Sequence, residues 1–148
     1  MNPPLRTQAD VDAVIEGLKD GTLDAIATDH APHHVDEKDV EFAVAANGIV
    51  GLETALCLSV TYLVKENHLT MPELLKKFTA NPADILSIPK GRLAEGADAD
   101  LVIFSDDECY EIDVTKFASK SKNSPYGGYS VYGKVAYTIV GGNVVYEG

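Results

Sequence analysis

One apolar run constrains the fold of this chain more than any other feature. Residues 23–28 read LDAIAT, which is nearly continuous in apolar character rather than alternating. A strand that is covered on both faces of a parallel sheet has this character. A single strand of this kind leaves both of its edges unpaired, so it needs neighbouring strands. The run is also short enough to be a buried helical turn.

The residues before and after this run predict helices. Thr7 and Asp10 form a capping-box pattern, and apolar residues at helical spacing follow until Gly21, which predicts a helix over 8–19. Residues 51–66 predict a second helix, which is too apolar to be fully solvated. Two short helices should follow, because TMPE at 70–73 and NP at 81–82 are typical of helix starts.

The last third of the chain has a different character, rich in Val, Ile and Tyr and interrupted by turn residues. The sequence TIVGGNVVY predicts a β-hairpin, and SKSKNSPYGGY predicts a loop, either ordered or flexible. The expected strands cover residues 100–104, 109–114, 131–140 and 143–147. None of them supplies parallel neighbours for residues 23–28. Either the chain pairs with itself, or it is the end of a longer protein.

Charge and composition exclude several classes of function. The chain has 12 Lys and Arg against 23 Asp and Glu, a net charge of −11, and no basic block that could neutralise phosphates, so nucleic acid is not an expected partner. No apolar stretch approaches the roughly 20 residues of a membrane span. The two cysteines show no CxxC spacing, which suits a reducing compartment. We expect a soluble, cytoplasmic protein.

Three of the four histidines fall within five positions, in the segment DHAPHH. Asp29 follows the apolar run directly, at the edge of a parallel sheet where α/β proteins build their sites. Asp29, His30, His33 and His34 could form a local zinc site, because carboxylate and imidazole are zinc ligands. They could also be loop residues that only bond the backbone, or one part of a site completed by other segments. His68 is expected to be solvated or to cap a helix.

Several segments resemble a known family. NPPLR, ATDHAPH, FAVAANGIVGLETAL, TANPADIL, GRLAEGADADLVIF and the stretch from SKSKNSPYGGY to the end are similar, in order, to the carboxyl-terminal part of the dihydroorotases, which are cyclic amidohydrolases. The resemblance implies an α/β fold: a fragment of a metal-dependent (β/α)₈ barrel plus part of a small β-sandwich. Residues 1–90 would belong to the barrel, with its eighth strand at about 23–28, and residues 91–148 to the sandwich.

The resemblance also implies roles for five residues. Asp29 would ligate the metal and act as the catalytic proton shuttle. Asn2, His33, Asn47 and Gly48 would bind the substrate. The cofactor would be zinc, one or two ions in the complete enzyme. The family's other metal ligands have no counterpart in this sequence, so we expect the isolated chain to be inactive.

The implied function is the interconversion of N-carbamoyl-L-aspartate and dihydroorotate in pyrimidine biosynthesis, by hydrolysis of a cyclic amide. Expected partners are the small-molecule substrate, the missing amino-terminal barrel portion, and either a second copy of the protein or aspartate transcarbamoylase. Two alternatives stay open. One is a non-catalytic scaffold or partner module of dihydroorotase-like sequence, and the other is a fragment of a hydantoinase or allantoinase.

Overall fold

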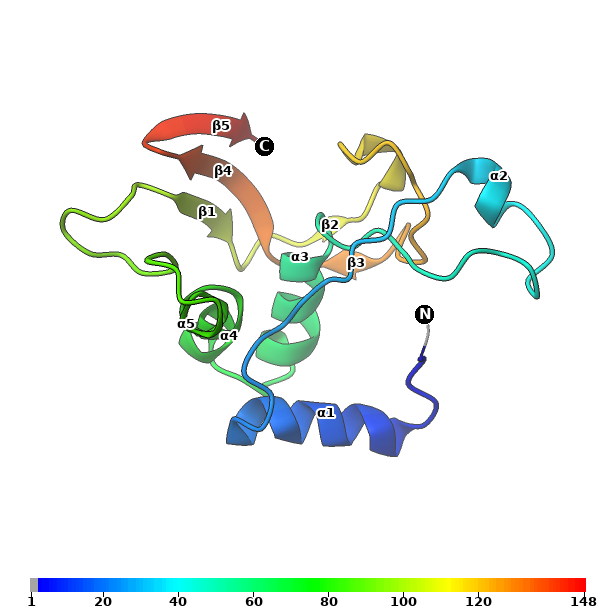
Figure 1. Cartoon of the computed structure of the whole chain (residues 1–148), viewed down its shortest axis with the longest axis horizontal. Coiled ribbons are helices and arrows are strands. Elements are labelled where there is room, and N and C mark those ends of the chain that lie inside the picture. Colours follow the sequence, from blue (N-terminus) through cyan, green and yellow to red (C-terminus); the bar gives the residue numbers. More distant parts are fainter. Residues whose placement is uncertain (1–2) are drawn as a thin grey trace.

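A computed structural model describes residues 3–148 of the chain, and Asn2 lies outside the described residues. The amino-terminal part is helical and the carboxyl-terminal part carries the strands (Figure 1). The helices are α1 (Gln8–Asp20), α2 (Val35–Lys38), α3 (Ala55–Ser59), the π-helix η1 (Val60–Lys65), α4 (Met71–Phe78), α5 (Ala80–Ile85) and the 3₁₀-helix η2 (Val114–Lys116). The strands are β1 (Leu101–Ser105), β2 (Tyr110–Glu111), β3 (Ser130–Val131), β4 (Lys134–Val140) and β5 (Asn143–Glu147).

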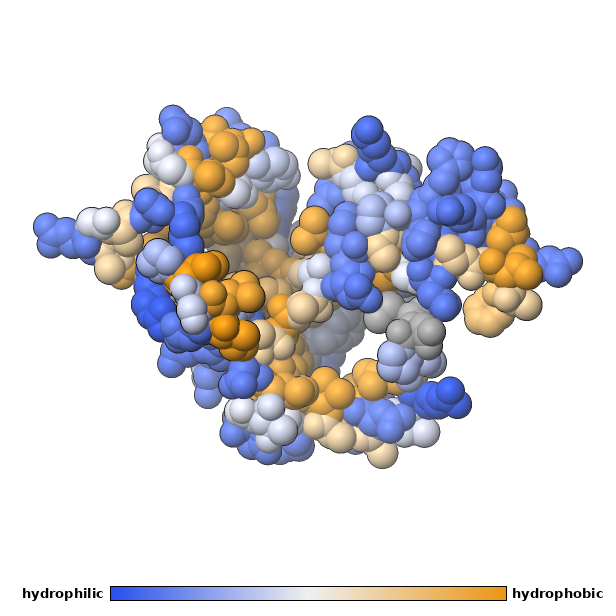
Figure 2. All heavy atoms as spheres, viewed as in Figure 1, coloured by the Kyte–Doolittle hydropathy of each residue, from blue (hydrophilic) through white to orange (hydrophobic). Residues whose placement is uncertain are grey.

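Helix α1 confirms the sequence prediction. The Thr7 side chain accepts a hydrogen bond from the Asp10 backbone, and the Asp10 carboxylate accepts one from the Thr7 backbone, so the capping box is complete. The helix ends at Gly21, whose φ of 85° only glycine adopts without strain. Its apolar edge faces the rest of the molecule (Figure 2), where Leu18 is buried.

The strand predicted over residues 23–28 is not formed among the described residues: residues 24–34 form no regular element. The reason is the lack of a partner, because no strand among residues 3–148 runs beside this segment and an unpaired strand leaves its backbone groups unsatisfied. The segment is instead tied to α4 and α5. Ile26 N–H donates to the Lys77 carbonyl over 3.1 Å, and the Asn81 side chain donates to the Asp24 carbonyl over 2.7 Å.

The apolar helix predicted over residues 51–66 begins only at Ala55, after a turn, and it consists of two parts, α3 and η1. The hydroxyl of Thr61 donates to the Cys57 carbonyl over 2.7 Å. In a regular α-helix, this carbonyl would accept from the backbone N–H of Thr61. The same hydroxyl accepts from Tyr132 N–H over 2.9 Å. The start of η1 is thereby tied to the strand region.

The two short helices form close to their predicted positions. Thr70 and Glu73 make a capping box at the start of α4. Helix α5 begins at Ala80, so Asn81 lies inside its first turn and does not cap it. The amide of Asn81 is used instead for the bond to Asp24.

The strands form one antiparallel sheet of order β1-β4-β5 and a separate short pair, β2 with β3. The predicted hairpin is confirmed as β4–β5, with Gly141 and Gly142 at positive φ in the turn. The sheet and the loop that carries α2 lie at opposite ends of the molecule, with α3 between them (Figure 1).

The core sits around the α3–η1 segment. One buried apolar cluster contains Leu18, Val60, Leu69 and Leu74, and a second contains Cys57, Ile112 and Val131. Gly133 approaches this segment so closely that a Cβ there would lie 3.1 Å from a Val60 methyl group. Between residues 3 and 148, no helix is long and apolar enough to cross a lipid bilayer.

Candidate functional site

Three loops that are far apart in the sequence meet at the α2 end of the molecule: residues 29–34, 46–50 and 121–124. The N–H of Ala31 donates to the Ile49 carbonyl over 2.9 Å. The N–H of Val50 donates to the Asn123 carbonyl over 3.1 Å. We call these three segments the loop cluster, and they carry all four of the predicted site residues that the structure describes.

Asp29 has a strained backbone. Its φ of 45° lies in the left-handed region, which is uncommon for residues other than glycine but more accessible to aspartate. The residue is exposed at the beginning of the loop, directly after the extended segment 24–28. Non-glycine residues held in this conformation concentrate at functional sites. Asn67 and Ser87 also have a positive φ, of 62° and 54°, so the backbone conformation alone does not assign a role to Asp29.

His30 has a structural role. Its Nδ1 accepts from Gly51 N–H over 3.1 Å and lies 3.5 Å from Leu52 N. A nitrogen that accepts backbone N–H groups carries no proton, so the ring proton of the neutral histidine sits on Nε2. Of the readings left open for the histidine segment, His30 thus follows the one in which a loop histidine bonds the backbone.

His33 lies between the loops. Its carbonyl accepts from the Ser121 hydroxyl over 2.6 Å, and its Nδ1 is 3.3 Å from a carboxylate oxygen of Glu37. The half-buried ring turns its Nε2 edge toward Gly48: a Cβ added to that glycine would lie 3.4 Å from Nε2. The structure therefore brings together two of the residues that were predicted to bind substrate, His33 and Gly48.

Gly48 could not easily be another residue. Its φ is 108°, and an added Cβ would lie 2.6 Å from the Cβ of Ala31. Its carbonyl oxygen accepts from the Lys38 ammonium over 2.9 Å and from the Asn123 amide over 3.2 Å. Because both lone pairs of that oxygen are occupied, a bound molecule would meet the exposed neighbour Asn47 or the Gly48 N–H instead.

His34 caps α2. Its Nδ1 accepts from Asp36 N–H over 3.3 Å, and its own N–H donates to Glu37 over 3.2 Å. The side chain is exposed. The three clustered histidines thus have three different environments and do not converge on one point.

The residues that sequence reasoning missed are Lys38, Ser121 and Asn123. Lys38 donates to the carbonyls of both Ala46 and Gly48, and Asn123 donates to the carbonyls of Ala31 and Gly48. For Ser121 and Asn123 the signal in the sequence was the polar stretch SKSKNSPYGGY, which predicted a loop. The structure shows that its residues 121–124 are ordered by these bonds.

No three His, Cys, Asp or Glu side chains are gathered closely enough to hold a metal ion in the part of the chain that the structure describes. The local zinc site that the sequence left open therefore does not form. A catalytic zinc centre needs three protein ligands and an open position. The described residues do not fit such a centre by themselves, and Asp29 is at most one of its ligands.

A cleft of about 750 Å³ lies beside the loop cluster and is basic although the chain is acidic. It is lined by Pro32, His33, His34, Val35, Lys38, Asp39, Lys120, Ser121, Lys122 and Asn123. Two of its lysines are committed to the protein. Lys38 bonds the loop carbonyls described above, and Lys122 donates to the carbonyls of Phe117 and Ser119.

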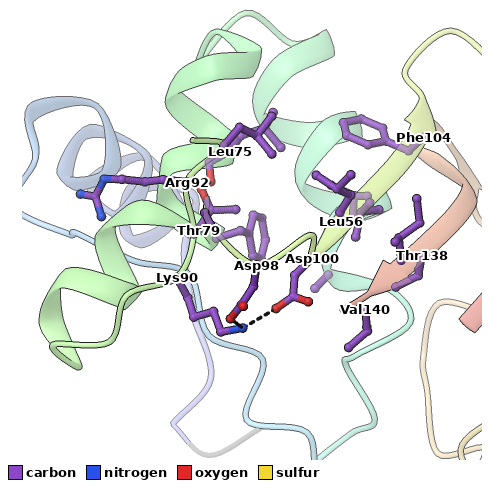
Figure 3. A pocket seen from close by; sticks show the side chains of 18 of the residues that line it. Leu56, Leu75, Thr79, Lys90, Arg92, Asp98, Asp100, Phe104, Thr138 and Val140 are labelled. Atoms are coloured by element: carbon purple, nitrogen blue, oxygen red, sulfur yellow. Dashed lines mark hydrogen bonds and ion pairs between the residues drawn. The ribbon is translucent and has the colours of Figure 1, made fainter. Parts of the chain in front are cut away.

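A second pocket, of about 740 Å³, lies between the sheet and helices α3 and α4 (Figure 3). Each of its charged side chains has a partner of opposite charge. Lys90 bonds Asp98 and Asp100, and Arg92 forms a two-pronged pair with Asp84. The remaining lining is mainly apolar and contains no histidine or cysteine.

Comparison with known proteins gives a consistent result. The model of the amidohydrolase family matches residues 3–145. The dihydroorotase of Acetivibrio thermocellus is 61% identical over 145 residues, which cover 98% of this chain and 34% of that protein. The dihydroorotase of Ruminiclostridium cellulolyticum is 59% identical over the same shares. The chain spans about a third of the length of these curated relatives.

Solved structures share the fold. The L-hydantoinase (dihydropyrimidinase) of Arthrobacter aurescens superimposes with a TM-score of 0.92 at 35% identity, covering 98% of this chain and 33% of that one. The D-hydantoinase (dihydropyrimidinase) of a Thermus species gives a TM-score of 0.89 at 27% identity, with 99% and 33% covered. The mixed helix and strand arrangement described above is therefore the same as that of about one third of the length of each of these two chains.

Proposed function

The chain belongs to the amidohydrolase family, and from this premise we propose that it is one third of a dihydroorotase. The complete protein would interconvert N-carbamoyl-L-aspartate and dihydroorotate in the cytoplasm. The observation that carries the proposal is the meeting of His33 with Gly48 in the loop cluster, beside the strained Asp29. The identity of 52–61% to eight dihydroorotases supports it.

We place this third at the carboxyl-terminal end of the complete protein, with residues 1–90 in a barrel and 91–148 in a β-sandwich. The extended segment 24–28 supports that placement. It is apolar, it has no strand partner among the described residues, and it ends at Asp29. A last barrel strand removed from its neighbours would have these properties, because its partners are strands from other parts of the barrel.

Asp29 is the proposed proton shuttle. Opening the ring adds water to the amide carbon and breaks the bond from that carbon to the ring nitrogen, which must gain a proton. A carboxylate can take the proton from the attacking water and deliver it to the nitrogen. His33 and the backbone of Asn47 and Gly48 would hold the ring, and Asn2, which lies outside the described residues, is proposed to do the same.

The family is generally metal-dependent, and we propose zinc, as one or two ions, for the complete protein. Asp29 is the single ligand that this chain would offer. Because the described residues gather no three ligands, the isolated chain should have no ring-opening activity. It would need the missing amino-terminal barrel portion as a partner. A second copy or aspartate transcarbamoylase is a further proposed partner of the complete protein.

A hydantoinase is the second candidate, and the L-hydantoinase fold match at 35% identity favours it. The two candidates differ in the ring that they open. A panel of dihydroorotate, hydantoin and dihydrouracil, tested on the natural protein that carries this sequence, distinguishes them. We expect ring opening of dihydroorotate only. Turnover of hydantoin alone would replace the proposal, and no turnover of any ring would favour the non-catalytic scaffold.

Substitution of Asp29 by Ala tests the assignment of the shuttle. We expect kcat for dihydroorotate to fall by about 10²- to 10⁴-fold, because a positioned acid–base group contributes about that much. Asp24→Ala is the matched control, since Asp24 is also an exposed aspartate, five positions earlier on the same segment. His33→Ala should chiefly raise KM. An Asp29→Ala protein with the turnover of the control would refute the role.

A further inference from the structure

Asn123 joins more of the loop cluster than any other single side chain described above. Its amide nitrogen donates to the carbonyls of Ala31, over 3.0 Å, and Gly48, over 3.2 Å. Its amide oxygen lies 2.5 Å from the hydroxyl oxygen of Ser121, whose single proton is donated either to this oxygen or to the His33 carbonyl. Its backbone carbonyl accepts from Val50 N–H. These bonds span the three loops, and Asn123 is 92 residues from Ala31 and 75 residues from Gly48 along the chain.

The chemistry allows only one orientation of this amide. The two loop carbonyls have only lone pairs to offer, so the NH₂ group must face them. Turning the amide over would place its oxygen against two carbonyl oxygens and would leave both of them without this donor. Asparagine therefore fits the position, whereas the isosteric aspartate has no donor for it.

The loop that presents Asn123 is itself anchored. The carboxylate of Glu53 accepts from the backbone N–H groups of Ala118, over 2.7 Å, and Ser119, over 3.1 Å. The ammonium of Lys122 bonds two carbonyls of the same loop. The loop of Asn123 is thus fixed to the turn before α3. From this fixed position, Asn123 can hold the two other loops at a defined separation.

We infer that Asn123 is a positioning residue, whose amide sets the separation of loop 29–34 from loop 46–50 and thereby places the ring of His33 against Gly48. This inference rests on the proposed function, in which both residues hold the cyclic amide. Asn123 does not touch the substrate. It acts through the carbonyls of Ala31 and Gly48. Its loss should therefore change the binding of the cyclic amide more than the proton transfer by Asp29.

Steady-state kinetics of the natural protein with dihydroorotate test this role. In Asn123→Ala and Asn123→Asp, we expect KM to rise by roughly 10- to 100-fold, because a misplacement of about 1 Å has effects of that size. The value of kcat should change less. Asn81→Ala is the matched control: Asn81 is also half-buried and donates its amide to a distant carbonyl, that of Asp24, but outside the loop cluster.

A purely structural role gives a different result. It would lower the melting temperature of the Asn123 and Asn81 variants alike and leave KM unchanged in both, and that outcome overturns the inference. A KM increase in Asn123→Asp at least as large as in Asn123→Ala supports it, because aspartate keeps the size of the side chain but replaces the amide donor with a charged carboxylate that only accepts.

Hydrogen exchange of the same proteins separates this inference from the proposed function. The N–H of Ala31 bonds the Ile49 carbonyl across the two loops, so its exchange reports their separation without any substrate. We expect at least tenfold faster exchange in both Asn123 variants and no change in Asn81→Ala. If the unmodified protein fails to open dihydroorotate, the proposed function fails, and this exchange still decides the role of Asn123. Unchanged exchange in the Asn123 variants overturns that role.

Discussion

The helical core and the loop cluster are built by opposite means. The core around α3 and η1 is held by apolar burial, with Val60 and Leu74 fully removed from solvent. The loop cluster has one buried apolar side chain, Val50, and is held by hydrogen bonds that end on the carbonyls of Ala31, Ala46 and Gly48. Burial is non-directional, whereas a hydrogen bond fixes distance and angle.

This difference teaches where each kind of substitution acts. A change in the core should reduce stability, because packed apolar area is lost. A change in the loop cluster should alter geometry at Asp29, His33 and Gly48, because few apolar contacts there compensate for a lost bond. The same division makes chemical sense for a site, since polar groups at its surface can both hold the loops and remain close to water.

Leu74→Ala should have the largest effect on stability. Leu74 is fully buried, and removing such a side chain from a packed core costs about 2–5 kcal/mol of the free energy of unfolding. Leu93→Ala is the control, because Leu93 is 84% exposed. Urea unfolding of the two variants measures the difference. Equal losses in both would contradict the assignment of the core.

Gly48→Ala should have an intermediate effect and should act on the loop cluster. It combines a left-handed φ with a contact of 2.6 Å to the Cβ of Ala31, and we expect a loss of about 1–3 kcal/mol together with faster exchange of the Ala31 N–H. Gly96→Ala isolates the backbone contribution, because Gly96 also has a positive φ, of 81°, but no atom within 4 Å of an added Cβ. If both variants lose the same stability, the close approach to Ala31 has no energetic importance.

Removing a capping carboxylate should have the smallest effect on stability, and that effect should depend on pH. Hydrogen bonds from Thr7 hold the pKa of Asp10 below its usual value, and those from Thr70 do the same for the pKa of Glu73. Because each folded pKa lies below the unfolded one, the stabilisation is complete above the unfolded pKa. It is lost as the pH falls through the folded pKa.

Melting curves between pH 2 and pH 7 measure this contribution. We expect Asp10→Asn to melt below the unmodified protein near neutral pH and to approach it in acid. A gap between Asp10→Asn and the unmodified protein that stays constant across this range would show that the capping carboxylate does not titrate with folding.

The sequence by itself determined the elements whose causes are local. The capping boxes at Thr7 and Thr70 and the Gly141–Gly142 turn lie within a few residues of the structure that they start or end. The sequence also nominated Asp29, His33 and Gly48, through the resemblance of their segments to a family.

Only the tertiary structure decided the rest. It left residues 24–28 without a strand partner, gave His30 to the backbone of Gly51, and used Asn123 to join three loops. Each of these outcomes depends on a group at least 21 residues away, or on the absence of a neighbouring strand. A local pattern contains no information about which distant donor will meet a carbonyl, because that meeting is set by how the helical core orients the loops.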